Sequence, residues 1–493
     1  MTDHPLHYQS IEFLANGLAD GSLTAVALAE AVIGRTVAVE PVLRAFISRN
    51  DEELLAEAVE SDRRRRAGKP RSRWDGIPIG IKDLISVRGQ PLTNGSRMME
   101  NYISPYDATV IARMRTAGMI PWGRLNLDEF AMGSSTEYSA FQKTANPWNL
   151  ARVPGGSSGG PAAAVAAGQV PAALGTDTGG SIRQPAAFCG ITGLKPTHGR
   201  VSRYGVTAFA SSLDQVGPIA RSVEDVAILC SIIAGHDGHD STSSRRPVPD
   251  LLAATQRCRS WTIGIPAEFF ADGLNQEVGD AVRTAITFFE KKGCSIQPIS
   301  LPNAPLGTAV YFLTATAEAF SNLARFDGIR YGHRSKNAED AVDIYGRSRA
   351  EGFGDEVKRR IILGAFVLSS GFQDAYYSRA QRVRTLICRD YAAAFAEVDL
   401  ILTPTSPTTA FPFGARNDDP LAMYLSDAYT VSINLAGLPA ISIPCGLDSQ
   451  CLPIGLQLIG KPYGEEELLA AANFFQKQHN FHLLRPCSVE EAS

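Results

Sequence analysis

Residues 155–186 read GGSSGGPAAAVAAGQVPAALGTDTGGSIRQPA, with two polar, glycine-rich loops whose serines Ser157 and Ser181 stand 24 residues apart. Between the loops, Pro161 suits the first position of a helix and Gly168 suits its end, so we predict a short helix there. Residues 170–174 resemble a short buried strand that leads into the second loop. The stretch therefore predicts a loop that feeds a helix, followed by a strand that feeds a loop.

The chain on both sides continues this alternation. Short apolar runs at 77–81 and 119–122 alternate with helical patterns, which predicts an α/β fold with a largely buried sheet. Residues 8–66 read as helical, with Asp51 as the cap of one segment. Because no linker or repeat separates folding units, we expect one domain over 1–493. Within it we expect a helical layer at 1–70, the catalytic motifs at 74–220 and the substrate pocket at 300–440.

Composition narrows the class of protein. The 493 residues are 44% hydrophobic and 20% charged with a formal charge of −4, which is ordinary for a globular protein in water. The eight cysteines form no C-x-x-C pair, so neither a zinc site nor a disulfide framework is expected. No signal peptide or membrane span is apparent, and we expect a cytoplasmic location. The basic run from Arg63 to Arg73 favours a solvated helix end and linker over the alternative of an RNA-binding patch.

The glycine-rich loops allow several kinds of chemistry. Neither loop holds the lysine that a phosphate-binding P-loop requires, so nucleotide binding is disfavoured. Residues 155–159 satisfy the G-x-S-x-G pattern of a nucleophile elbow, but His333, His479 and His482 have no context that marks a helper histidine. The cluster HDGHD at 236–240 favours a turn over a metal site.

The remaining interpretation is a serine nucleophile with a lysine base. Lys82 follows the apolar run at 77–81 and should therefore end a buried strand. A lysine pKa near ~10.4 has to fall to about 7, which corresponds to ~4–5 kcal/mol in favour of the neutral form. Burial between apolar walls can supply a shift of that size.

Three motifs together resemble the amidase signature family. They are GIPIGIKD at 76–83, GGSSGG at 155–160 and GTDTGGSIRQPA at 175–186. The resemblance implies that Ser181 is the nucleophile, that Ser157 follows a cis peptide bond and relays the proton, and that Lys82 is the base. It also implies a central twisted mixed sheet of about eleven strands surrounded by helices. The backbone N–H groups of Thr178, Gly179, Gly180 and Ser181 are expected to form the oxyanion hole.

Further motifs resemble the A subunits of bacterial tRNA-dependent amidotransferases within that family. They include DEFAMGSSTE at 128–137, FCGITGLKPT at 188–197, GRVSRYG at 199–205, SNLARFDG at 321–328 and NLAGLP at 434–439. The resemblance implies hydrolysis of glutamine, with Arg360 on the α-carboxylate, Asp427 on the α-ammonium and Tyr311 lining the pocket. Arg359 is the neighbouring candidate for the role of Arg360. The family pattern differs locally at Pro161 and His198.

The same resemblance implies the partners. The B and C subunits would complete a heterotrimer in which ammonia converts misacylated Glu-tRNA(Gln) or Asp-tRNA(Asn) to Gln-tRNA(Gln) or Asn-tRNA(Asn). The B subunit would use ATP and Mg²⁺ and make most contacts with the tRNA, while this chain would need no cofactor and no metal. The alternatives are a free-standing amidase that acts on other small amides and a catalytically silent scaffold.

Overall fold

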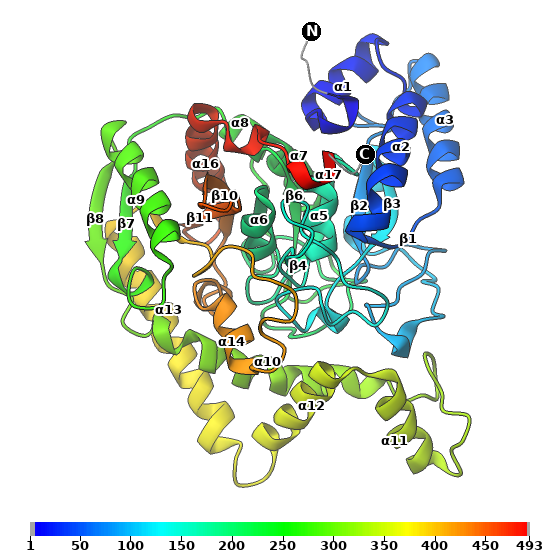
Figure 1. Ribbon diagram of the computed structural model, residues 1–493, viewed down its shortest axis with the longest axis vertical. Coiled ribbons are helices and arrows are strands. Elements are labelled where there is room, and N and C mark those ends of the chain that lie inside the picture. Colours follow the sequence, from blue (N-terminus) through cyan, green and yellow to red (C-terminus); the bar gives the residue numbers. More distant parts are fainter. Residues whose placement is uncertain (1–4, 491–493) are drawn as a thin grey trace.

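An eleven-stranded mixed sheet crosses the molecule in the computed structural model, which describes residues 5–490 (Figure 1). The strand order is β1-β3-β2-β4-β6-β5-β10-β11-β9-β7-β8. The pairs β2–β3, β2–β4, β7–β8 and β7–β9 are parallel and the others antiparallel, so the expected mixed α/β sheet is confirmed. The strands are β1 (Phe46–Ser48), β2 (Pro78–Lys82), β3 (Ile120–Leu125), β4 (Ala172–Asp177), β5 (Thr192–Lys195), β6 (Gln215–Ala220), β7 (Thr262–Pro266), β8 (Ser295–Ile299), β9 (Leu400–Pro404), β10 (Ala440–Leu447) and β11 (Pro453–Gly460).

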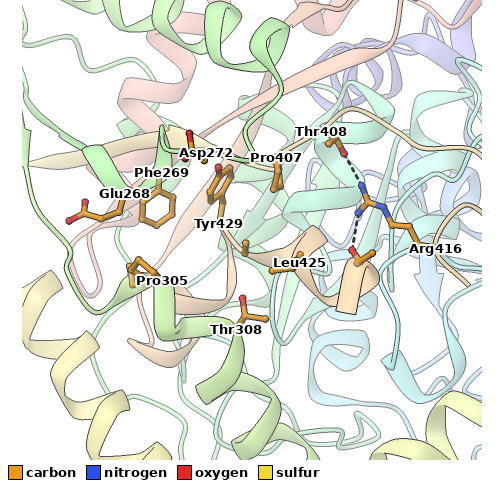
Figure 2. A pocket seen from close by; sticks show the side chains of 14 residues that line it. Glu268, Phe269, Asp272, Pro305, Thr308, Pro407, Thr408, Arg416, Leu425 and Tyr429 are labelled. Carbon is orange, nitrogen blue, oxygen red and sulfur yellow. Dashed lines mark hydrogen bonds between the residues drawn. The ribbon is translucent and has the colours of Figure 1, made fainter. Parts of the chain in front are cut away.

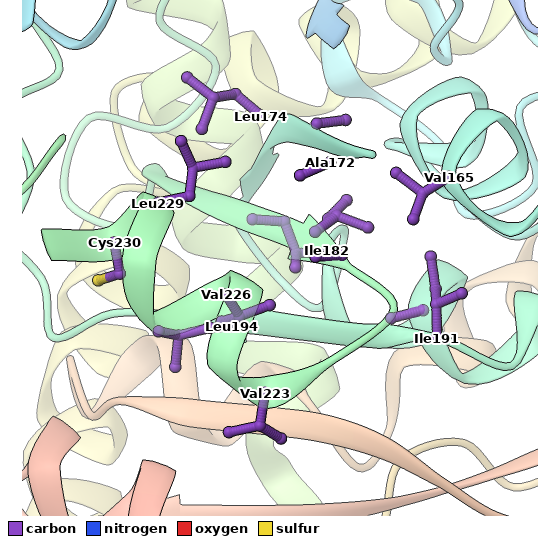
Figure 3. Close-up of a cluster of buried hydrophobic side chains, with 14 of the residues drawn as sticks. Val165, Ala172, Leu174, Ile182, Ile191, Leu194, Val223, Val226, Leu229 and Cys230 are labelled. Carbon is purple, nitrogen blue, oxygen red and sulfur yellow. The ribbon is translucent and has the colours of Figure 1, made fainter. Parts of the chain in front are cut away.

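Helices cover both faces of the sheet (Figure 1). They are α1 (Ile11–Asp20), α2 (Ala25–Leu43), α3 (Asp51–Arg66), α4 (Thr109–Ala117), α5 (Gly159–Ala166), α6 (Arg183–Cys189), α7 (Val223–Ile233), α8 (Leu251–Ala254), α9 (Gln276–Lys291), α10 (Gly307–Asn322), α11 (Ala341–Gly352), α12 (Asp355–Leu368), α13 (Arg379–Glu397), α14 (Pro420–Tyr424), α15 (Val431–Leu435), α16 (Glu465–His479) and α17 (Cys487–Glu490). Figure 3 shows the core at the centre, where Val226 and Leu229 of α7 lie with Leu174 of β4 and Leu194 of β5. Every residue of β4 and β5 is buried, as expected for strands that helices cover on both faces.

The N-terminal segment differs in detail from its sequence-based prediction. Helices α1, α2 and α3 form the expected layer, but β1 lies between α2 and α3 and pairs with the edge of the sheet. Asn50, rather than Asp51, caps α3 by accepting a hydrogen bond from the backbone N–H of Glu53. Asp51 instead lies in the first turn, where its negative charge interacts favourably with the positive end of the helix dipole. Similarly, α5 begins at Gly159, so Pro161 is its third residue and not its first.

A helical layer at one end of the sheet is built from α10, α12 and α13 (Figure 1). Helices α10 and α12 approach closely because Gly364 has no side chain. A Cβ atom there would lie 2.1 Å from the carbonyl oxygen of Thr316. This layer carries Tyr311 on α10 and Arg360 on α12, and both side chains are buried.

Several sequence features turn out to be structural. Residues 236–240 form a turn, as predicted. Asp237 within it accepts hydrogen bonds from Thr109 and Ser202. Arg64 of the basic run is paired with the buried Asp75, and Arg73 is paired with Glu12. Within residues 5–490, no helix combines the length and the apolar character needed to cross a membrane. The same residues hold no cluster of histidine, cysteine and acidic side chains that could bind a metal ion.

Candidate active site

Lys82 ends strand β2 and is fully buried. Its Nζ donates hydrogen bonds to three hydroxyls, those of Ser157 (2.8 Å), Ser158 (2.9 Å) and Thr176 (2.8 Å). The sheet explains this meeting, because β2 and β4 are parallel neighbours with Ile81 opposite Leu174. The carboxyl ends of the two strands therefore lie side by side, and the residues that follow them converge.

Burial lowers the pKa of Lys82 to about 7, against the opposing influence of the carboxylates of Asp128, Asp177 and Asp214. A neutral lysine surrounded by hydroxyls can accept a proton from one of them. Asp128 is itself buried and accepts hydrogen bonds from the backbone N–H groups of Thr136 and Tyr138. Burial raises the pKa of Asp128 to about 6. At neutral pH the strand end can therefore supply a base.

Hydrogen bonds to backbone N–H groups connect the two serine loops. The peptide bond between Gly156 and Ser157 is cis, as predicted. The N–H of Ser158 donates to the carbonyl of Ser181 at 3.1 Å, and the side chain of Gln184 accepts the N–H of Gly156 at 3.0 Å. The expected hydrogen bond between the Ser157 and Ser181 hydroxyls is not formed in the described part of the chain. Catalytic hydrogen bonds are often long without a substrate and shorten when it binds.

A buried ion pair supports the loop that carries Ser181. Arg183 donates from Nε and Nη2 to the carboxylate of Asp177, each at 3.0 Å, and also to Asn434 and Gln457. Although burial by itself would raise it, Arg183 lowers the pKa of Asp177 to about 2. Asp177 also accepts the N–H groups of Gly180 and Ile182 on either side of Ser181. The pair therefore fixes the turn that carries Ser181.

One of the four N–H groups expected to form an oxyanion hole already has an acceptor within the protein. The N–H of Gly180 donates to Asp177 Oδ1 at 2.9 Å and is not free for a substrate. Within the described chain the N–H groups of Thr178, Gly179 and Ser181 have no acceptor, and they are the three free donors at this turn. Small residues are required here, since a Cβ atom on Gly179 would lie 2.7 Å from the ring of Tyr311.

Arg360 lies in an aromatic pocket near this turn. Its guanidinium is 5.1 Å from the ring centre of Phe312 and 5.4 Å from that of Tyr424. Its Nε donates to Glu356 at 2.8 Å, whereas its two Nη groups make no hydrogen bond within residues 5–490. Glu356 also accepts a hydrogen bond from Tyr424 at 3.0 Å. The terminal fork of Arg360 is thus available for a carboxylate. The neighbouring Arg359 is half exposed and pairs with Glu356 from the outside.

Asp427 is a buried carboxylate without a cation in the part of the chain that the structure describes. Its Oδ2 accepts a hydrogen bond from Ser134 at 2.5 Å, and its Oδ1 is buried with no partner. Burial raises the pKa of Asp427 to about 7. A buried unpaired acceptor is costly unless a ligand satisfies it. An ammonium group is the ligand that would satisfy both the charge and the free oxygen.

Sequence reasoning missed several side chains of this site. Ser158 and Thr176 complete the hydroxyl cage of Lys82, Ser134 supports Asp427, and Glu356 and Tyr424 hold Arg360. Two signals were present. Ser158 and Thr176 lie inside the quoted motifs, and Glu356 precedes Arg360 by four residues, which is one helical turn. No sequence signal links Tyr424 or Ser134 to their partners.

Among residues 5–490, no histidine is hydrogen-bonded to Ser157 or Ser181. His333 binds Glu351, and His479 stacks on Phe475 at 4.2 Å. Burial lowers the pKa of His198 to about 4. The geometry therefore disfavours a Ser-His-acid triad.

The chain is similar to known proteins along most of its length. A model of the family described as Amidase matches residues 27–469. The chain is 56% identical over 482 residues to the A subunit of glutamyl-tRNA(Gln) amidotransferase from Roseiflexus sp., covering 98% of each chain. It is 55% identical, with the same coverage, to the protein of that name from Chloroflexus aggregans.

A solved structure shares the fold. The crystal structure of the A subunit of glutamyl-tRNA(Gln) amidotransferase from Thermotoga maritima superposes with a TM-score of 0.80 at 40% identity. The match covers 96% of this chain and 95% of the other. The similarity therefore extends through both the serine loops and the α10–α13 layer.

Proposed function

The chain belongs to the amidase family, and from this premise we propose that it is the glutamine-hydrolysing A subunit of a glutamyl-tRNA(Gln) amidotransferase. The observation that carries the proposal is the buried Lys82, hydrogen-bonded to Ser157 at 2.8 Å beside the loop of Ser181. Arg360 and Asp427, which do not pair with each other, offer one positive and one negative charge to a substrate. These charges favour an α-amino acid amide over amides in general.

The first half-reaction forms an acyl-enzyme. Neutral Lys82 accepts the proton of Ser157, Ser157 accepts the proton of Ser181, and the Ser181 oxygen attacks the side-chain amide carbon of glutamine. The free N–H groups of Thr178, Gly179 and Ser181 face the developing oxyanion, and each donor of this kind is worth roughly 3–4 kcal/mol. The relay then returns a proton to the nitrogen, and the C–N bond breaks to release ammonia.

The second half-reaction regenerates the serine. Water attacks the ester carbon of the glutamyl-enzyme, and the same relay removes its proton. The ester bond to Ser181 breaks, glutamate leaves, and the proton returns to the Ser181 oxygen. Lys82 is neutral again at the end, so the cycle consumes only glutamine and water.

Substrate recognition uses opposite charges at the two ends of the backbone of glutamine. The free fork of Arg360 holds the α-carboxylate, and the unpaired oxygen of Asp427 accepts from the α-ammonium. Tyr311 lines the space between them, and burial raises the pKa of its hydroxyl well above the usual range, so it stays protonated. The unpaired oxygen of Asp427 and the fork of Arg360 then both have partners, which is the physical basis for selecting glutamine over simple amides.

The assembly follows from the same function. We propose that the B and C subunits complete a heterotrimer, and that this chain itself uses no cofactor. The B subunit uses ATP and Mg²⁺ to activate the misacylated tRNA and makes most tRNA contacts. The sheet contains strands from β1 to β11, which supports one domain for the whole chain. We expect the chain to work in the cytoplasm, where aminoacyl-tRNA is used.

The test is reconstitution with the purified B and C subunits, glutamine, ATP, Mg²⁺ and Glu-tRNA(Gln). Ser181→Ala should abolish both glutamate release and glutamine-dependent formation of Gln-tRNA(Gln). Amidation with ammonium chloride as the nitrogen donor should persist, because that donor bypasses this site. Ser370→Ala, at an exposed position on another loop, is the matched control. A Ser181→Ala assembly that still uses glutamine would refute the assignment.

A further inference from the structure

A cavity of about 470 Å³ lies beside the segment that carries Asp427 (Figure 2). Leu425, Ala428 and Tyr429 line it, but Asp427 does not, because its side chain bonds to Ser134. The volume falls in the range of sites that hold small molecules or inserted side chains. The cavity is therefore separate from the proposed glutamine site, although both share one short stretch of chain.

The walls of the cavity are apolar with an acidic end. Its apolar lining residues include Phe269, Pro305, Pro407, Leu425 and Tyr429. Figure 2 shows Glu268 and Asp272 at the end away from Arg416. The cavity therefore offers an apolar middle, an acidic end and, opposite that end, Arg416.

Neither of these two carboxylates has an ion-pair partner in the described part of the chain. Glu268 Oε1 accepts hydrogen bonds from Ser300 and Leu301, but its Oε2 is buried without a partner. Asp272 is exposed and belongs to none of the ion pairs found within residues 5–490. Arg416, at the opposite end, donates hydrogen bonds to the hydroxyls of Thr408 and Ser426. The acidic end of the cavity is therefore complementary to a positive charge carried by an otherwise apolar group.

Exposed leucines extend this apolar surface. Leu421 on α14 is 62% exposed, and Leu425, at the start of the next turn, is 48% exposed. Single exposed leucines are common, but two of them four residues apart, one of which lines an apolar cavity, are typical of an interaction site. Asp418 and Asp419 precede α14 and are exposed, which adds negative charge to its border.

We propose that this cavity and the two leucines form the docking site for a basic, amphipathic segment of another subunit of the amidotransferase. The segment inserts an apolar side chain between Phe269 and Tyr429 and directs lysine or arginine toward Glu268 and Asp272. The inference rests on the proposed function, which makes this chain one subunit of an assembly.

Docking at this site acts on the active site through residues 425–430. Asp427 lies two residues after Leu425, and Thr430 Oγ1 donates at 2.6 Å to the carbonyl of Gly179 in the nucleophile turn. The carbonyl of Thr430 also accepts from Arg183 at 3.3 Å. A partner that immobilises this segment fixes Asp427 and the oxyanion turn together, so the KM for glutamine falls on assembly.

The experiment measures binding of the purified B and C subunits by isothermal titration calorimetry. The double variant Leu421→Asp/Leu425→Asp should bind about 30-fold or more weakly, since truncated or charged anchors at interface centres cost the most. Leu483→Asp, at a leucine that is 50% exposed in the segment after α16, is the matched control and should bind as wild type.

A second variant tests the charge of the partner without touching the leucines. Glu268→Gln/Asp272→Asn keeps the shape of the acidic end and should weaken binding about tenfold at low ionic strength, with a smaller effect at high salt. Wild-type affinity in both double variants would overturn the inference.

Kinetics separate this inference from the proposed function. The KM for glutamine should fall on assembly of the wild type but stay high in the leucine variant at subsaturating concentrations of the B and C subunits. A KM that falls equally in both proteins would overturn the link to the active site. If the reconstituted wild type releases no glutamate, the proposed function is refuted instead. The binding assay does not require glutaminase activity and tests the docking site on its own.

Discussion

Replacing Asp427 by asparagine isolates the charge that we assign to the glutamine ammonium. Asparagine keeps the size of the side chain, and its amide oxygen can still accept from Ser134, whose hydroxyl lies 2.5 Å from Asp427 Oδ2. Only the negative charge is lost. Lys82, Ser157 and Ser181 are not touched by the change, so chemistry after binding should continue.

The expected magnitude follows from the contact. A hydrogen bond to a charged group contributes about 1.5–3 kcal/mol. Its loss raises KM for glutamine by roughly 12- to 160-fold and leaves kcat within a few-fold of wild type. Steady-state glutamate release measures both constants, and Asp280→Asn on the exposed face of α9 serves as the control.

The pH profile gives a sharper readout. Burial lowers the pKa of Lys82 to about 7, and its neutral form, which we propose as the base, exists above that pH. Burial raises the pKa of Asp427 to about 7, and its ionised form, to which we assign glutamine binding, also exists above that pH. As the pH falls below about 7, log(kcat/KM) of the wild type should therefore drop with a slope approaching two. Asp427→Asn should reduce the slope to one.

The same variant should be more stable than wild type at pH 8. The pKa of Asp427 rises from 3.8 in the unfolded chain to about 7 in the folded protein. The free energy of unfolding of the wild type therefore falls as the pH increases from 3.8 to about 7. Asparagine avoids this cost, which is on the order of a few kcal/mol. The gain in Tm should vanish near pH 4. An unchanged KM together with a slope of two in Asp427→Asn would refute the assignment of the ammonium site.

Three further predictions concern other parts of the site. Lys82→Ala should lower kcat by about 10²–10⁴-fold because the base is lost, while His198→Ala should leave kcat unchanged; glutamate release tests both, and a dead histidine variant would restore a histidine mechanism. Glu356→Gln should raise KM for glutamine about tenfold at constant kcat, since the guanidinium that it orients loses its ion partner; an effect on kcat alone would argue against this role. Gly179→Ala should lower kcat/KM at least tenfold because its Cβ meets Tyr311 at 2.7 Å, and the second change Tyr311→Leu should restore room for it; no loss in the single variant would contradict the packing.

Short sequence motifs predicted the main residues of the candidate active site and the class of fold. The motifs at 76–83, 155–160 and 175–186 pointed to Lys82, Ser157 and Ser181, because each motif encodes its own strand end or turn within a few residues. The apolar run before Lys82 predicted a buried strand end, and β2 is indeed buried along its full length. The mixed sheet followed from the family resemblance, and its eleven strands are present.

Errors in the prediction arose where neighbours compete for a local role. Asn50 and Asp51 are both good helix caps, and only the backbone path decides that Asn50 takes the position. The sequence of the second loop offers four N–H donors, but the carboxylate of Asp177 takes that of Gly180. A pattern of residue types does not reveal which donor is already used.

The amino-acid sequence by itself determined the reaction class, since the serines and the lysine lie in short motifs with local geometry. The tertiary structure alone decided which distant side chains complete the site. Glu356 and Tyr424 are 68 residues apart, and Ser134 and Asp427 are 293 apart, yet each pair shares a hydrogen bond. Such contacts depend on how α12, the segment of α14 and Asp427, and the loop of Ser134 pack against one another. Periodicity along the chain records only which face of an element is buried, not which residue it meets there.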